Sequence, residues 1–110
     1  MKRRLNLAQL LLATEHARTE SARASAYYQL ALFHDNNTRE AEAIPNYEQA
    51  LRLGLSGETR AQAFAWLASS FHKTGRPRRA TDSLAQSRAA TRDAALKKFL
   101  DDLERRIRRA

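Results

Sequence analysis

The side chains that could do chemistry in this chain are few. Its histidines are His16, His34 and His72, and the absence of cysteine excludes disulfides, thiolate catalysis and zinc–thiolate sites in this sequence. His16 and Glu20 are four positions apart, a spacing that would place two metal ligands on one face of a helix. Two ligands do not make a metal site, and a solvated pair is the commoner arrangement. We therefore expect no bound metal.

The sequence motifs of common catalytic sites are also missing. The chain has no glycine-rich phosphate loop, no nucleophile elbow and no pair of carboxylates that would line a cleft. The acidic pairs Glu40/Glu42 and Asp101/Asp102 fit helix starts and solvent-facing positions instead. We expect neither enzyme activity nor a cofactor, and we therefore expect the chain to act by binding a partner.

Basic side chains are the remaining candidates. The 110-residue chain carries a net charge of +8, and the excess lies mainly in Lys73–Arg79 and Arg105–Arg109. The second run falls in a last helical turn, where cations interact favourably with the helix dipole, but the first borders a helix start, where they do not. Arg76, Arg78 and Arg79 therefore form a candidate basic patch for acidic partners. Nucleic acid is the less favoured partner, because no stacking aromatic side chains are evident beside the charge.

These residues must be positioned by helices. Three Gly, two Pro and abundant Ala, Leu, Arg and Glu predict an all-α chain. We expect six helices. The first three cover residues 3–22, about 25–35 and about 38–53, and the last three cover residues 58–73, 77 to about 90, and 92–109. Asn37 or Thr38, Ser56 and Thr91 are the expected N-caps, and Gly54 suits a left-handed helix end.

A pattern of large and small residues occurs twice along these helices, 37 positions apart. Each copy predicts a helix, a tight turn and a second antiparallel helix, with small residues where the two backbones approach. A lone hairpin cannot bury its apolar face, so it must stack on a neighbour. The copies are Tyr27, Leu30, Ala31, Ala43, Tyr47 and Ala50, followed by Phe64, Leu67, Ala68, Ala80, Leu84 and Ser87.

This doubled pattern resembles the signature of the tetratricopeptide repeat, and in particular small bacterial proteins of that family. The resemblance covers roughly residues 24–90. It departs from the signature at His34, where an aromatic is usual, and at Leu55 and Arg92, where proline is usual. The family period is about 34 residues, and the three extra residues fit the turn from Gly54 to Thr59.

The resemblance implies the domain organisation. Residues 1–110 are expected to form one α-solenoid domain of two antiparallel helix-turn-helix repeats with flanking helices. Its parts are an N-terminal flanking helix at 3–22, repeat 1 at 24–57, repeat 2 at 58–91, and a C-terminal capping helix at 92–109.

The resemblance also implies a function, that of a non-catalytic adaptor that binds a peptide or helix of a partner protein. In the family, the first helix of each repeat lines a concave groove. The implied partner-binding residues are Tyr28, Leu32, Asn36, Trp66, Ser69, His72 and Lys73. The alternative is that Tyr28 and Leu32 pack against the N-terminal helix and that Trp66 lies wedged between the repeats. The Lys and Asn set of chaperone-binding members is not reproduced.

Two other functional hypotheses stay open. One is a basic adaptor associated with nucleic acid, and the other is a homodimer or larger homo-oligomer formed through an uncovered terminal helix. The basic start before Leu5–Ala13 weakly resembles a secretory signal, but Asn6 and Gln9 interrupt the apolar run. No stretch reaches membrane-spanning length. We expect a bacterial, cytoplasmic protein without a membrane partner.

Overall fold

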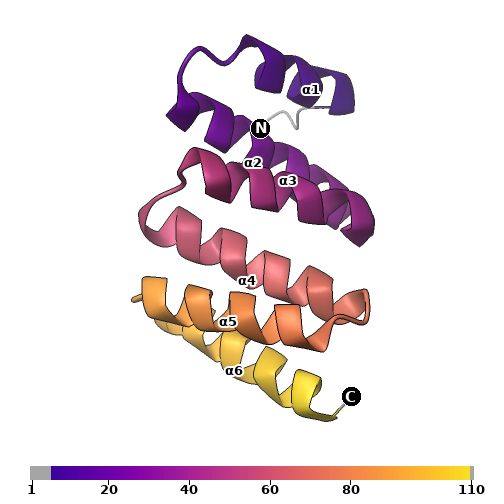
Figure 1. The fold of residues 1–110 in the computed structure, drawn as a ribbon, viewed down its shortest axis with the longest axis vertical. Coiled ribbons are helices and arrows are strands. Elements are labelled where there is room, and N and C mark those ends of the chain that lie inside the picture. Colours follow the sequence, from indigo (N-terminus) through magenta and orange to yellow (C-terminus); the bar gives the residue numbers. More distant parts are fainter. Residues whose placement is uncertain (1–5, 110) are drawn as a thin grey trace. The chain divides into compact units, whose positions relative to one another are not determined.

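The computed structural model describes residues 6–109, which form six α-helices and contain no strand (Figure 1). The predicted all-α fold class is confirmed. The chain divides between Leu55 and Ser56 into two compact units. The helices of the N-terminal unit are α1 (Leu7–His16), α2 (Glu20–Asn36) and α3 (Glu40–Leu53), and those of the C-terminal unit are α4 (Gly57–Lys73), α5 (Pro77–Ala90) and α6 (Ala94–Arg109).

In the N-terminal unit, α2 and α3 form a helix hairpin, and α1 packs on α2. The small residues Ala31 and Ala43 are fully buried, as expected for positions where two helix backbones approach closely. Tyr47 is also fully buried, and its hydroxyl donates a hydrogen bond of 2.7 Å to Asp35 Oδ2. The first copy of the repeated pattern therefore holds this hairpin together.

The predicted helix at residues 3–22 is wrong at its C-terminal end, because the chain leaves the helix after His16. Ala17 is extended, with φ −63° and ψ 127°. Thr19 Oγ1 then accepts a hydrogen bond of 3.0 Å from the Ala22 N–H and starts α2, several residues earlier than predicted. A threonine hydroxyl competes for backbone donors in this way and favours a cap over a helix interior. The first residues of the predicted helix, 3–5, lie outside the described part of the chain.

The ends of α3 also differ in part from the prediction. The N-cap position is Arg39, which makes no side-chain capping bond, and neither Asn37 nor Thr38 caps the helix. Thr38 instead takes a left-handed φ of 57° within the turn between α2 and α3. At the other end, Gly54 has φ 114°, as predicted for a left-handed helix terminus.

In the C-terminal unit, α4 and α5 form the second hairpin, and α6 packs on both. The fully buried Ser87 donates its hydroxyl hydrogen to the carbonyl oxygen of Ala61 at 2.7 Å, which ties α5 to α4. A row of small residues on α4 meets leucines from α5 and α6. This buried cluster contains Ala61, Ala65, Ala68, Leu84, Leu96, Leu100 and Leu103.

Two of the N-caps predicted for this unit differ in the structure. Ser56 occupies the N-cap of α4 but makes no side-chain capping bond. Asp93, rather than Thr91, caps α6, because Asp93 Oδ2 accepts a hydrogen bond of 2.8 Å from the Leu96 N–H. Thr91 Oγ1 instead accepts from the Asp93 N–H at 3.0 Å. A carboxylate at the cap is favoured over a hydroxyl by the positive end of the helix dipole.

A helix that crosses a bilayer must be both long and predominantly apolar. Between residues 6 and 109, no helix combines the length and the apolar character needed to cross a bilayer.

Candidate functional site

The candidate positions on α2 and α4 correspond in pairs at the repeat offset of 37 residues. On both helices the exposure of these positions increases toward the C-terminal end, in the same order. Tyr28 and its equivalent Ala65 are buried. The next two pairs, Leu32 with Ser69 and Asp35 with His72, are half-buried. Asn36 and its equivalent Lys73 are exposed. Each unit therefore presents the same kind of half-exposed surface on the first helix of its hairpin, α2 or α4.

Tyr28 contributes little to that surface. Its side chain is 6% exposed, and its ring centroid lies 6.1 Å from that of Tyr47 in a tilted arrangement. A ring so enclosed offers a ligand almost no contact area. We therefore assign Tyr28 to the packing of the N-terminal unit.

Trp66 faces the C-terminal helix. Its ring meets Phe99 of α6 edge to face, with centroids 5.1 Å apart and planes at 75°, and both side chains pack against the buried cluster of the unit. This geometry is the favoured one for aromatic pairs. Trp66 is half-buried, and its main contact links α4 to α6.

The histidines do not assemble into a chemical site. His16 ends α1 and Glu20 begins α2, so the predicted common helix face does not exist. Burial lowers the pKa of His34, the positive charge of Arg39 lowers it further, and His34 Nδ1 has no hydrogen-bond partner in the described chain. Within residues 6–109, no three His, Asp or Glu side chains gather closely enough to hold a metal ion.

The basic patch, Arg76, Arg78 and Arg79, is exposed at the turn between α4 and α5. Two of its guanidinium groups lie over the ring of Phe71, with Cζ-to-centroid distances of 4.5 Å for Arg79 and 6.0 Å for Arg76. The Arg76 N–H also donates to the Phe71 carbonyl oxygen at 2.8 Å. The sequence analysis missed this role of Phe71, although an aromatic residue directly before a basic turn is a usable signal for cation–π contacts.

A shallow hollow of about 400 Å³ adjoins the patch at the start of α5. Its lining consists of Pro77, Arg78, Thr81 and Asp82. The basic patch thus has a concave border on one side.

The arginines at the end of the chain differ in that several are paired with carboxylates. Arg88 of α5 lies 2.8 Å from Asp101 and 3.5 Å from Glu104, both on α6. Arg108 lies 3.6 Å from Glu104, and Arg105 pairs with Asp102. These ion pairs offset part of the positive charge there, an effect that the sequence analysis did not predict.

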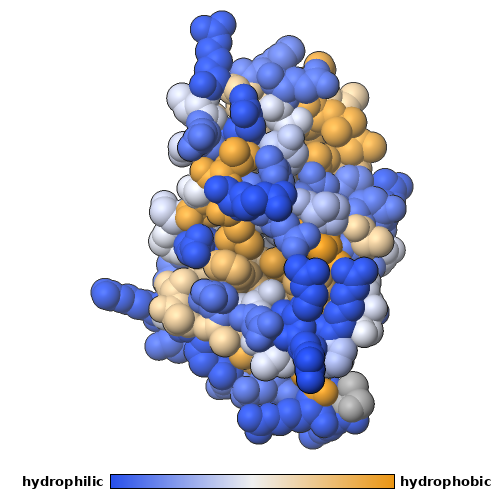
Figure 2. All heavy atoms as spheres, in the orientation of Figure 1, coloured by the Kyte–Doolittle hydropathy of each residue, from blue (hydrophilic) through white to orange (hydrophobic). Residues whose placement is uncertain are grey.

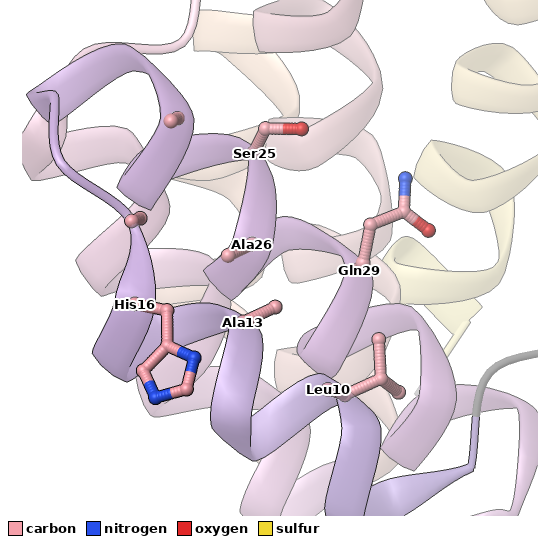
Figure 3. A pocket seen from close by; sticks show the side chains of 8 residues that line it. Leu10, Ala13, His16, Ser25, Ala26 and Gln29 are labelled. Atoms are coloured by element: carbon pink, nitrogen blue, oxygen red, sulfur yellow. The ribbon is translucent and has the colours of Figure 1, made fainter.

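The structure also reveals an apolar surface on α1 that the sequence analysis did not single out. Leu11 and Leu12 are 46% and 49% exposed, and apolar side chains gather at the surface over α1 in Figure 2. Beside them, a groove of about 430 Å³ separates α1 from α2 (Figure 3), lined by Leu10, Ala13, His16, Ala17, Ala22, Ser25, Ala26 and Gln29. Three successive leucines on a helix point about 100° apart, so one face cannot bury them all.

The comparisons with known proteins bear on the repeat. A family model described as a tetratrico peptide repeat matches residues 24–104. The matched segment begins in α2 and ends within α6, so it includes both hairpins and most of the C-terminal helix. No curated protein and no solved structure matches the chain.

Proposed function

The chain belongs to the tetratricopeptide repeat family, and on that premise we propose that it is a non-catalytic adaptor that binds a peptide or a helix of a partner protein. Repeats of this family typically serve as protein-interaction scaffolds. We further propose a cytoplasmic location, which is supported by a cysteine-free sequence that fits a reducing compartment.

The repeated exposure along α2 and α4 is the observation that carries the proposal. Packing residues such as Leu30 and Leu67 are buried at equivalent places. Leu32 and its equivalent Ser69 are both half-buried, and Asn36 and its equivalent Lys73 are both exposed. Matched surface positions of this kind would suit a ligand that contacts both repeats. The proposed partner-binding residues are Leu32, Asn36, Ser69, His72 and Lys73, with the buried Tyr28 and the half-buried Trp66 supporting them.

The chemistry of these side chains suits a polypeptide ligand. Leu32 offers a half-buried apolar contact, and Asn36 can both donate to and accept from a peptide backbone. Ser69 and His72 supply further polar atoms at the equivalent places of α4. Binding of this kind needs no reaction, since the output is the recruitment of the partner.

The proposal is tested by affinity capture. The chain is immobilised, exposed to lysate of its native organism, and the retained proteins are quantified by mass spectrometry and then purified for binding measurements. Asn36→Ala combined with His72→Ala is expected to weaken binding of the purified partner by about tenfold, because two interface contacts are lost. Gln86→Ala, an exposed change on α5, serves as the matched control and should leave binding unchanged.

Two results would contradict the proposal, the first its adaptor function and the second the binding residues assigned to α2 and α4. One is the absence of any specifically retained protein together with salt-sensitive retention of RNA or DNA, which would favour a nucleic-acid-associated adaptor. The other is a partner whose affinity is unchanged by the α2 and α4 substitutions, which would place binding on another surface.

A further inference from the structure

We propose that the basic patch recognises an acidic segment of the partner, a stretch of polypeptide rich in Asp and Glu. This inference rests on the proposed adaptor function, because it names the chemistry of the partner. It adds a second binding surface, at the turn between α4 and α5, to the one presented by the first helices.

The first argument is the preorganisation of the guanidinium groups. Phe71 is only 1% exposed, so its ring is a fixed platform for the Arg79 and Arg76 groups stacked on it. A stacked guanidinium uses its face for the ring, so the N–H donors in the plane of the Arg76 group can be offered to a carboxylate. Stacking also lowers the conformational entropy that these side chains lose when a ligand binds.

The second argument is the distribution of charge. Within residues 6–109, neither Arg76 nor Arg78 forms an ion pair, whereas Arg88, Arg105 and Arg108 pair with carboxylates. The guanidinium groups of Arg76 and Arg78 therefore keep their positive charge unpaired within the described chain. Such groups attract opposite charge on a partner.

The third argument is the shape of the adjoining surface. The hollow beside Arg78 is large enough to receive acidic side chains next to the stacked arginines. The carboxylate of Asp82 lies on the wall of the hollow and would repel acidic side chains. The Thr81 hydroxyl already donates a hydrogen bond of 2.9 Å to the Pro77 carbonyl oxygen. An acidic segment is thus expected to bind at the arginine side of the hollow, away from Asp82.

Nucleic acid fits this surface less well than polypeptide carboxylates do. Binding of single strands uses aromatic platforms for the bases, but Phe71 is covered by its arginines and Trp66 packs on Phe99. Binding of a duplex requires positive charge along an extended track. The three arginines of the patch lie within four consecutive residues, and other arginines of the unit, Arg88 among them, are paired with α6 carboxylates.

The test uses the full chain and a fluorescent peptide of about eight glutamates, which spans roughly 25 Å when extended. A glutamine peptide and single-stranded oligothymidylate of the same length are the comparison probes. Arg76→Gln combined with Arg78→Gln removes two charges from the patch, and Arg106→Gln combined with Arg109→Gln removes two exposed charges from the end of α6. Asp82→Asn removes the repelling carboxylate from the hollow.

We expect the patch variant to bind the glutamate peptide about tenfold more weakly, the α6 variant to bind within about twofold of the original chain, and Asp82→Asn to bind about twofold more tightly. Equal losses in the patch and α6 variants would overturn local recognition in favour of general charge attraction. Tighter binding of oligothymidylate than of the glutamate peptide, or no binding of the glutamate peptide, would also overturn it.

The adaptor function is judged separately. If a captured partner binds the patch variant as tightly as the original chain, the acidic-segment inference fails and the adaptor function stands. If the original chain captures no protein partner, the adaptor function itself fails.

Discussion

The carboxylate of Glu58 stabilises a loop of the C-terminal unit by accepting two hydrogen bonds. Its donors are the Arg92 backbone N–H and the Thr91 hydroxyl, each at 2.7 Å. The bond from Arg92, followed by that from Thr91, lowers the pKa of Glu58. The start of α4 is thereby tied to the loop between α5 and α6.

This hydrogen bonding makes the stability of the unit depend on pH. Because the folded-state pKa is lower than the unfolded-state value of about 4.3, the stabilisation is complete above that value and is lost as the pH falls through the folded-state pKa. Glu58→Gln should lower the melting temperature near neutral pH, with a difference that shrinks in acid. Thermal unfolding followed by circular dichroism across this range measures it. Glu15→Gln, an exposed change on α1, is the control, and a Glu58→Gln difference that is constant with pH would contradict the assignment.

The hydroxyl of Tyr47 has a comparable role in the N-terminal unit. Burial, followed by the hydrogen bond to Asp35, raises the pKa of Tyr47, so the phenol stays protonated and acts as donor. Tyr47→Phe should cost about 1.5 kcal/mol of stability, since a bond to a charged acceptor is lost while the half-buried Asp35 can still reach water. Denaturant titration measures the cost. Tyr27→Phe is the matched control, and equal effects of the two changes would argue against the Asp35 bond.

Among the elements, α6 shows how a helix is attached to the hairpin beside it. Leu100 is fully buried in the cluster that α6 shares with α4 and α5, and the alanines of α4 let the helix approach closely. The opposite side of α6 carries exposed charges such as Lys97 and Arg105.

Leu100→Ala should therefore loosen α6. Truncation of a buried leucine costs about 2–5 kcal/mol. Trp66, the single tryptophan of the chain, contacts Phe99 of α6, so its emission should shift to the red in the variant as the helix loosens. Leu12→Ala, at an exposed position, should change neither the emission nor the melting temperature. An unchanged Trp66 spectrum in Leu100→Ala would show that α6 remains docked without this side chain.

For the whole molecule, net charge and the apolar surface of α1 act against each other in self-association. Leu11 and Leu12 could pair with those of a second copy, but two side chains bury far less than the roughly 1,600 Å² of a standard interface. A net charge of +8 on each copy adds repulsion.

We expect a monomer at low salt and weak association as salt screens this repulsion. Light scattering at increasing salt concentration measures the effect, and Leu11→Ser combined with Leu12→Ser should abolish the association. A dimer that persists at low salt and micromolar concentration would reverse this expectation and favour the homo-oligomer hypothesis.

The sequence by itself determined the two hairpins. Burial at Leu30, Ala43 and Tyr47, and at their equivalents in the second copy, follows from side-chain size and helical spacing, which are local properties. The left-handed turn at Gly54 was predictable for the same reason, because only backbone conformation is involved. The break before Thr19 was not predicted, since its signal is a single capping residue inside a helix-forming stretch.

Only the tertiary structure decided which open positions are available to a partner. The stacking of Arg76 and Arg79 on Phe71, the turn of Trp66 toward Phe99 and the enclosure of Tyr28 each depend on which side chain packs beside which. The exposure of Leu11 and Leu12 likewise depends on how much of α1 its neighbour α2 can cover. Spacing along a helix sets the direction of a side chain, but its burial is set by neighbours brought together only by folding.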